Sequence, residues 1–254
     1  MEVRRLRTRS PQAARVTSDD RGRRTAALIS RHGLENRRPV ATTGSDRRIG
    51  DDRAAEAFRQ VRKGHDVNEV LRAAAELQRF CEERAWQFCI IGGVAVQRWA
   101  DPRQTEDAAL TILAGFGEEE VFVDTLLENF RPRIEGERER AVIRRVVLLF
   151  SSEGVGLDVA LGALPFEERC IQRATDWKIS PQISLRTCSA EDLVVLKAFA
   201  ARDLDWADVA SIVMRQGRKL NLEQIWRELQ PLVEAKEQPE ILTRLQKIFD
   251  DALD

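Results

Sequence analysis

The chain contains no tyrosine and only two histidines among its 254 residues. His32 and His65 both precede the first strongly helical segment, so neither belongs to the expected core. A catalytic triad or a metal site that depends on imidazole is therefore excluded from that core. Carboxylates, lysines and arginines remain as working groups, and this set suits phosphoryl chemistry assisted by a metal ion.

Cysteine is also scarce. Cys81, Cys89, Cys170 and Cys188 form no Cys-x-x-Cys pair, and three of them stand beside apolar residues. Thiols scattered in this way are more often small core side chains than disulfide partners or ligands of a structural zinc ion. We therefore expect free core thiols and no structural metal.

Long apolar runs are missing as well. The segments AVIRRVVLLF and DLVVLKAFAA are interrupted by charge and too short to cross a bilayer. The N-terminal sequence MEVRRLRTRSPQAARV has no apolar stretch after its arginines, so it does not resemble a secretory signal. We expect a cytoplasmic protein without a membrane partner, and its 43% hydrophobic residues suffice to bury a core.

Charge is distributed unevenly along the chain. The net charge of −1 includes residues 1–50, which carry 13 arginines, no lysine and five acidic residues, a local net charge of +8. A segment of this kind buries too little apolar surface to offset its ordering entropy, which favours a disordered Arg-rich tail. Binding to nucleic-acid phosphates is the alternative interpretation.

Hydrophobic periodicity and turn residues predict an α/β region at 51–187. Its strongest helix, at 66–85, begins at a capping-box pattern formed by Asp66 and Glu69. The other expected elements are a short helix at 51–64, a strand at 86–91 that ends at Gly92-Gly93 with a short helix after it, a strand at 105–113, a helix at 118–130, and strands at 140–150 and 155–162 that a turn at 151–154 joins into a hairpin.

Beyond residue 163 the pattern becomes mainly helical and predicts a C-terminal helical bundle at 188–254. Pro165 stands at a helix-opening position, and Ser189 with Asp192 forms a second capping-box pattern. The expected elements are a helix at 165–174, a strand at 183–188, a helix after Ser189, and helices at 203–216, 221–235 and 239–252.

The glycine pair Gly92-Gly93 lies between an expected strand and an expected helix. Glycine lets the backbone approach a ligand closely, and the amides at a helix N-terminus favour an anion such as phosphate. A tight strand–helix turn without a ligand is the alternative interpretation.

Two acidic residues interrupt apolar strand segments. Because side chains alternate along a strand, Asp107 shares a face with Ala109, and Asp158 shares a face with Ala160. Two acids on the small-residue faces of neighbouring strands could hold a divalent cation between them. Solvated residues on the wet face of a sheet are the alternative interpretation.

The sequences IIGGVAVQRW, RQTED, GLDVALG and AEDLVVLKAFAARDLDWADV, in this order, resemble the nucleotidyltransferase family that includes the AbiEii/AbiGii-type toxins of bacterial phage-defence and toxin–antitoxin systems. The resemblance covers residues 67–254 and is sharpest over 89–208. It implies an α/β (α+β) fold of the polymerase-β type, a mixed sheet with flanking helices followed by a helical C-terminal domain.

The same resemblance implies transfer of a nucleoside monophosphate from an NTP to an acceptor, with Mg²⁺ or Mn²⁺ ions held by strand carboxylates. RNA is one candidate acceptor and an antitoxin protein is a candidate partner. Carried over residue by residue, the resemblance assigns Gly92 and Gly93 to the phosphate-binding turn, and Arg103 and Thr105, which lead into the acidic strand, to nucleotide binding. It assigns Asp107 and Asp158 to catalysis as metal ligands. It assigns Lys197 to catalysis as a cation, in one polar cluster with Arg202, Asp203 and Asp208. A lysine on the helix surface is the alternative interpretation for Lys197.

One position departs from the family pattern. The acidic strand of the family carries Asp-x-Asp, whereas this chain has Asp107-Ala108-Ala109. Phosphoryl transfer with two metal ions needs several oxygen ligands, and a methyl group supplies none. Glu106 lies on the opposite strand face unless a bulge redirects it.

Three hypotheses follow from this departure. In the first, the chain keeps the nucleotidyltransferase fold and nucleotide binding, with catalysis weakened or lost. In the second, the same scaffold is a non-catalytic module that holds a protein or RNA partner. In the third, the glycine turn and the two acids are incidental in an unrelated α/β protein.

Overall fold

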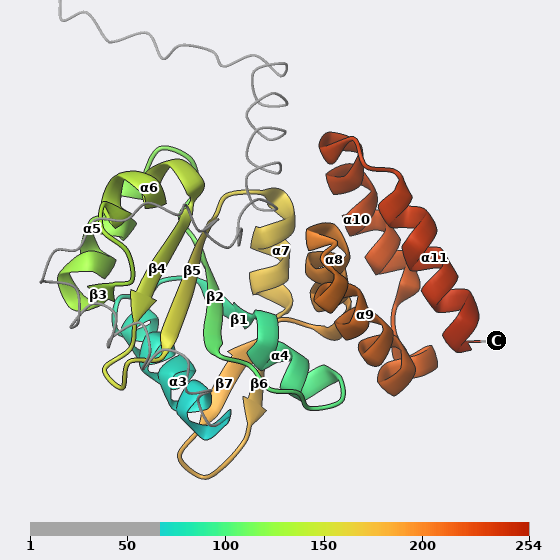
Figure 1. Ribbon diagram of the computed structural model, residues 1–254, viewed down its shortest axis with the longest axis horizontal. Helices are drawn as coiled ribbons and strands as arrows, with labels where there is room; N and C mark the ends of the chain where they lie inside the picture. The colour runs from blue at the N-terminus through green and yellow to red at the C-terminus, as the bar shows by residue number, and fades with distance from the viewer. Residues whose placement is uncertain (1–66, 254) are drawn as a thin grey trace, which may run out of the picture.

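The structure, a computed structural model, describes residues 67–253. The predictions for the Arg-rich tail, for the helix at 51–64 and for Asp66 lie outside the described residues. The described chain forms one seven-stranded mixed sheet with helices on both faces, as predicted, and a group of helices from the C-terminal part packs beside it (Figure 1). No helix in this part of the chain is long and apolar enough to span a membrane.

The sheet has the strand order β3-β4-β5-β2-β1-β7-β6. Its centre is β2, which runs antiparallel to β1 and parallel to β5. The hairpin predicted around residues 151–154 is present, because β4 and β5 pair antiparallel. The strands are β1 (Phe88–Ile91), β2 (Asp107–Leu113), β3 (Arg131–Pro132), β4 (Val146–Phe150), β5 (Gly156–Gly162), β6 (Thr175–Lys178) and β7 (Ser184–Thr187).

One face of the sheet is covered by α3 (Val67–Glu83), α5 (Glu119–Asn129) and α6 (Glu137–Arg144). Alternate apolar residues of the strands, such as Leu110 and Leu157, point into this layer and are fully buried. The alternation buries one set of side chains and leaves the set that contains Asp107 and Asp158 on the other face.

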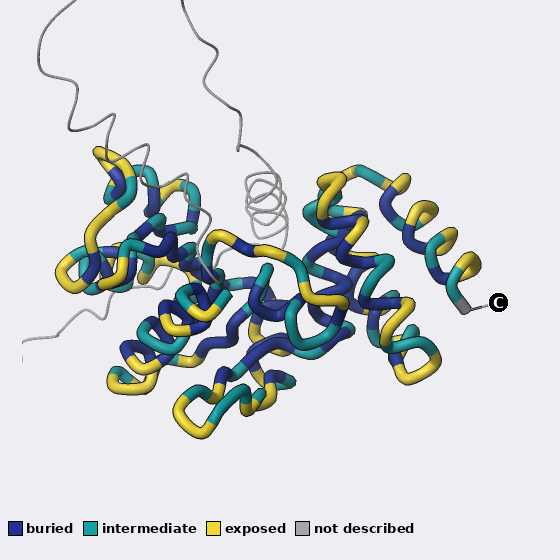
Figure 2. The backbone as a smooth tube through the Cα atoms, turned by 60° about the horizontal axis from the view of Figure 1, so that its bottom comes forward, coloured by how far each residue is buried: buried dark blue, intermediate teal, exposed yellow. Residues whose placement is uncertain are grey.

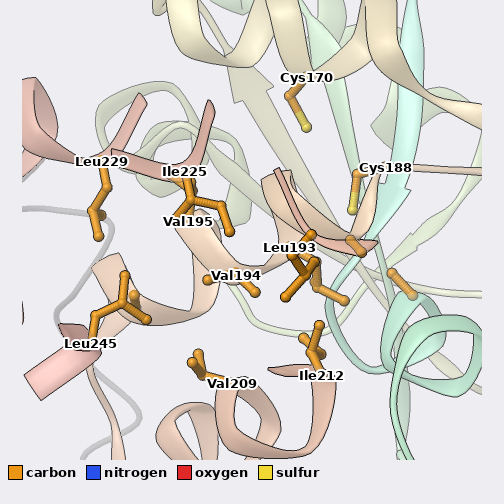
Figure 3. Close-up of a cluster of buried hydrophobic side chains, with 14 of the residues drawn as sticks. Cys170, Cys188, Leu193, Val194, Val195, Val209, Ile212, Ile225, Leu229 and Leu245 are labelled. Carbon is orange, nitrogen blue, oxygen red and sulfur yellow. The ribbon is translucent and has the colours of Figure 1, made fainter. Parts of the chain in front are cut away.

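The other face is covered by α4 (Gly92–Trp99) and α7 (Pro165–Arg173), and the C-terminal helices pack against these two helices. Cys89 of β1 belongs to the same hydrophobic cluster as Val195, Ile212 and Leu229 of those helices. Figure 3 shows side chains from several of these helices meeting in this cluster, with Cys170 and Cys188 at its edge. The C-terminal helices are α8 (Ala190–Ala200), α9 (Asp203–Gln216), α10 (Leu222–Lys236) and α11 (Glu240–Leu253), with a short 3₁₀ turn at Gly217–Lys219.

Burial follows this layered arrangement (Figure 2), with buried backbone along the central strands and on the facing sides of the C-terminal helices, and exposed residues in the loops and along their outer sides. Val146, Leu148 and Phe150 of β4 are only half-buried. They lie on the same sheet face as Asp158, since Leu148 pairs with Asp158. In the described part of the chain, this end of the second face is therefore partly open to solvent.

The strand predicted at 140–150 is wrong in its first half. Residues up to Arg144 form α6, and Arg145 ends that helix in a left-handed conformation with φ of 56° before β4 begins. Glu137 and Glu139 in the first turn favour a helix start because their charge complements the helix dipole. The buried Arg145 side chain donates to Leu161 O at 2.8 Å and to Gly115 O at 2.6 Å. These contacts stabilise the break, and they come from segments distant in sequence.

Most other predicted elements are confirmed within one to three residues at each end. The helix predicted at 203–216 is α9 with the same bounds, and Pro165 is the first residue of α7. Ser189 caps α8, accepting a hydrogen bond from Asp192 N at 3.1 Å. The edge strands β3 and β6 were not predicted, because their residues are short polar segments without apolar alternation. All four cysteines are free and buried, as predicted.

Buried charges attach the C-terminal helices to α7. Arg173 donates to both carboxylate oxygens of Asp192, at 2.5 and 3.0 Å, and to Glu228 at 3.0 Å. Asp192 is 0% exposed and Glu228 is 2% exposed. Glu228 has a second partner in Arg169, whereas Asp192 has only Arg173 as an ion-pair partner within residues 67–253.

We expect Arg173→Leu to lower the free energy of unfolding by about 3 kcal/mol, because it leaves Asp192 buried without a counter-ion. Arg169→Leu is the matched control, since Glu228 keeps its contact with Arg173. Urea denaturation of both variants measures the difference. Equal losses for the two variants would show that Asp192 does not depend on Arg173.

Candidate functional site

The glycine turn lies directly against β2. Gly92 has φ of +63°, a conformation that favours glycine, and a Cβ added there would come 2.9 Å from the Cβ of Ala109. A Cβ on Gly93 would come 2.1 Å from Oγ1 of Thr105, which is itself buried. Neither glycine can therefore carry a side chain without displacing β2 or the segment before it. The contact places the N-terminus of α4 in front of Ala109.

The two strand acids lie on this same side. In the parallel pairing of β2 with β5, Ala109 is in register with Asp158, and Asp107 is in register with Gly156. In-register residues of parallel neighbours share a sheet face, so Asp107, Ala109 and Asp158 point the same way. The structure thus brings together the glycine turn and the two acids that the sequence analysis selected.

Asp158 already has a cationic partner. Arg133, which follows β3, forms an ion pair with its carboxylate. Burial raises the pKa of Asp158 to about 6; the charge of Arg133 opposes that rise, and the charge of Asp107 adds to it. The effect of Asp107 indicates that the two carboxyl groups are close enough to interact.

The side chains here do not fit the pair of Mg²⁺ or Mn²⁺ ions that the resemblance implies. Ala109 offers a methyl group in place of a carboxylate, and Asp158 is bound by Arg133. Glu106 is exposed and precedes β2, so it does not replace the missing acid. Within residues 67–253 no group of three or more His, Cys, Asp or Glu side chains is placed to hold a metal ion. We therefore assign no metal centre to this face.

Lys197 is neither a surface lysine nor a free cation. Its ammonium group lies 2.9 Å from Asp205 Oδ1 and 2.9 Å from Asp208 Oδ2, and the residue is 8% exposed. Each carboxylate has a second partner: Arg103 Nε and Nη2 contact Asp208 at 2.6 and 2.7 Å, and Arg202 Nε contacts Asp205 at 2.6 Å. We call these five residues the Lys197 network.

The network differs from the predicted cluster in two ways: Asp203 is exposed and Asp205 takes its place, and Arg103 joins through Asp208. Asp205 and Asp208 are three residues apart on α9 and so share one helix face, a spacing that could have indicated the pair. Burial alone would raise the pKa of both carboxyl groups. Hydrogen bonds from Arg202 and Arg103, together with the charge of Lys197, outweigh burial and hold each pKa below its ordinary value.

The network positions the segment that leads into β2. Arg103 is held by Asp208 through its side chain, and its carbonyl oxygen accepts a hydrogen bond from Gln97 of α4. Thr105 follows two residues later and lies under Gly93. Arg103 and Thr105 therefore fix the position of the glycine turn and of Asp107, whatever contact they make with a ligand.

Two surface hollows lie elsewhere. One of 690 Å³ is formed by α10 and α11 around Trp226 and Leu242, and one of 310 Å³ lies beside Trp99 and Glu191. Neither is lined by Asp107, Ala109 or Asp158. The acids and the glycine turn meet on the face in front of β2 and β5, away from these two hollows.

Comparisons with known proteins give distant likenesses. No protein-family model matches the chain, and no curated protein matches it. Among solved structures, an antigenic nucleotidyltransferase-like protein from Paracoccidioides brasiliensis is 15% identical over 71% of this chain and 93% of its own, with a TM-score of 0.44. The antibiotic-resistance factor ANT(2'')-Ia is 17% identical over 70% of this chain and 98% of its own, with a TM-score of 0.45.

The CCA-adding enzyme of Thermotoga maritima, solved in complex with tRNA, is 11% identical over 76% of this chain and 53% of its own, with a TM-score of 0.28. Nucleotidyltransferase-like proteins are thus among the solved structures that the chain is similar to. All three likenesses are too distant to assign an activity. Function has to be inferred from the residues in front of β2 and β5.

We expect Lys197→Met to lower the free energy of unfolding by about 3 kcal/mol, because two buried carboxylates lose a shared counter-ion. Lys247→Met, at an exposed position of α11, is the control and should stay within about 0.5 kcal/mol of wild type. Urea denaturation measures both. A fully stable Lys197→Met protein would show that the lysine is free for a ligand instead.

Proposed function

We propose that this chain is a nucleotidyltransferase-type protein that binds a nucleoside triphosphate in front of β2 and β5, and in which transfer of the nucleoside monophosphate is weakened or lost. One observation carries the proposal: the glycine turn lies against Ala109, between the acids of β2 and β5. The face keeps the parts that bind phosphate and lacks an acid at its centre. The resemblance over residues 67–254 supports the same assignment.

Phosphate binding is assigned to the N-terminus of α4. The helix begins at Gly92, and its N-cap residue, Ile91, has no side chain that accepts a hydrogen bond from the first turn. Backbone N–H groups of a first turn need acceptors, and their partial positive charge favours an anion. The first turn contains no acidic residue that would compete with a phosphate. Glycine at both positions lets this first turn pack directly against Ala109 and Thr105.

Weak transfer follows from the remaining residues. Attack of an acceptor oxygen on the α-phosphate, with departure of pyrophosphate, builds negative charge that has to be neutralised. Asp107 and Asp158 add negative charge, and the cations Arg133 and Arg202 both have carboxylate partners. Ala109 contributes no ligand for a further cation. We infer that this face binds a nucleotide but transfers its nucleoside monophosphate only weakly.

The acceptor of the nucleoside monophosphate and the biological role of the protein are predicted from the family resemblance alone. An RNA acceptor, a toxin–antitoxin role and an antitoxin partner come from the resemblance. The Arg-rich residues 1–50 are the segment with the charge to bind RNA, and they lie outside the described residues. The non-catalytic binding module is the competing function, and Ala109 with the Arg133–Asp158 ion pair favours it over an active transferase.

The first test concerns the glycine turn. Gly92→Ala places a methyl group against Ala109, so we expect at least about tenfold weaker binding of a nucleoside triphosphate, measured by isothermal titration calorimetry. Gly115→Ala is the control, because Gly115 has a similar φ of +70° and nothing within 4 Å of an added Cβ. Gly115→Ala should lose about 1 kcal/mol of stability through its positive φ, and Gly92→Ala should lose more because its methyl group also meets Ala109. Equal affinities would remove the turn from the binding site.

The second test restores the missing acid. We expect wild type to transfer labelled nucleoside monophosphate to RNA or protein only near background with Mg²⁺ or Mn²⁺, and Ala109→Asp to raise transfer at least about tenfold, or 1.4 kcal/mol of activation free energy. Ala109→Asn is the matched control, of the same shape without the charge. Efficient transfer by wild type would contradict weakened catalysis. If none of the three proteins transfers label and none binds a nucleotide, the result would support the non-catalytic binding module.

A further inference from the structure

Arg133 reaches over Gly156 to the carboxylate of Asp158. Its backbone N–H donates to Leu148 O at 2.9 Å, which continues the pairing of β3 with β4. Leu148 is in register with Asp158, so the Arg133 side chain crosses β4 to reach the Asp158 carboxylate on β5.

The absence of a side chain at Gly156 makes room for the guanidinium. A Cβ at Gly156 would lie 2.8 Å from Nη1 of Arg133 and 3.4 Å from the Cβ of Asp107. Arg133 and Asp107 are thus neighbours over the same glycine, while Nη2 of Arg133 contacts Asp158. One positive charge thus pairs with Asp158 and lies beside Asp107.

We propose that Arg133 takes the place of a divalent cation, so that the chain binds the phosphates of a nucleoside triphosphate without any metal ion. This inference rests on the function proposed for the same face. A guanidinium has five N–H donors in a planar fork and a permanent charge, so it can donate to a carboxylate on one side and to a phosphate on the other. In the described part of the chain, the guanidinium has Asp158 as its ion-pair partner. Nε is buried without an acceptor.

A metal ion would have to compete with this arrangement. To bind Asp158 it would displace Arg133, whose side chain is 22% exposed, and leave that charge without its carboxylate. Removal of one partner from this partly buried ion pair is unfavourable. In return the ion would gain Asp107 and no third carboxylate. The geometry therefore favours the arginine over a cation from solution.

A second cation adjoins the same space. Arg202, in the loop between α8 and α9, has a side chain that is 67% exposed. Its pKa is raised mainly by the hydrogen bond to Asp205, and the charges of Asp107 and Asp158 contribute to the same rise. A phosphate at the N-terminus of α4 would lie in front of Ala109, beside the Asp158 carboxylate that Arg133 contacts. Arg133, with the more exposed Arg202 as a second cation, then supplies the charge that a metal ion would otherwise supply.

The test compares binding of ATP, CTP, GTP and UTP by isothermal titration calorimetry in EDTA and in Mg²⁺. For wild type we expect at least one nucleotide to bind in EDTA with a Kd within about threefold of its value in Mg²⁺. Arg133→Gln should weaken binding in EDTA at least about tenfold. Arg138→Gln is the control, because Arg138 is more exposed and pairs with Asp124 and Glu120 away from the acids.

Gly156→Ala provides a second variant that keeps the charge. Its methyl group would displace the tip of Arg133, a flexible end that can move, so the protein should fold and binding in EDTA should weaken about threefold or more. If Arg133→Gln fails to fold, this variant carries the test. Unchanged affinity in both variants would overturn the inference.

The outcomes separate the inference from the function that it rests on. Binding that requires Mg²⁺ overturns the role of Arg133 and leaves nucleotide binding intact. Tighter binding of the Mg²⁺ complex by Arg133→Gln also overturns it, because Arg133 would then obstruct the site. Absence of binding in both buffers overturns the inference and the proposed function together.

Discussion

The contact of Lys197 with Asp205 and Asp208 is the constraint on which the candidate site depends. A buried ammonium group between two carboxylates is stable only if each charge keeps its partners, and Arg103 and Arg202 complete that set. Through Arg103 the network reaches the segment before β2, and through Lys197 it reaches α8. The C-terminal helices therefore hold the acidic strand in place, and the helical part of the chain cannot be treated as an independent appendage of the sheet.

The same constraint acts on the glycine turn. Thr105 is buried two residues after Arg103, and its hydroxyl lies where any side chain on Gly93 would stand. The glycine turn also lies against Ala109 of β2. The turn, β2 and the segment around Thr105 therefore meet with space only for small residues. A side chain at position 109 therefore points at the backbone of the glycine turn, and the packing of Thr105 under Gly93 fixes where that backbone lies. The chemistry available at this face depends on which side chain occupies position 109.

Local rules recover much of this fold and part of the site. Strand alternation was sufficient to place Asp107 and Asp158 on one face, and turn residues located the hairpin and Gly92-Gly93. Where contacts between distant segments decide the structure, local rules fail: α6 ends at Arg145 because Leu161 and Gly115 supply its acceptors. Arg133 was missed for the same reason, since nothing in the sequence around it indicates that β3 pairs with β4 and aims its side chain at Asp158.

Ala109 and Arg133 both reduce the negative charge in front of β2 and β5. Two carboxylates on neighbouring strands repel each other unless a cation lies between them, and the raised pKa of Asp158 reflects both its burial and this proximity. A carboxylate at position 109 would add a third negative charge, which divalent ions could neutralise and a single guanidinium could not. With a methyl group there, the face carries only two acids, and Arg133 pairs with one of them, Asp158. The absence of the acid and the presence of the arginine are therefore mutually consistent, and together they support the proposal that this face holds a nucleotide without cleaving it efficiently.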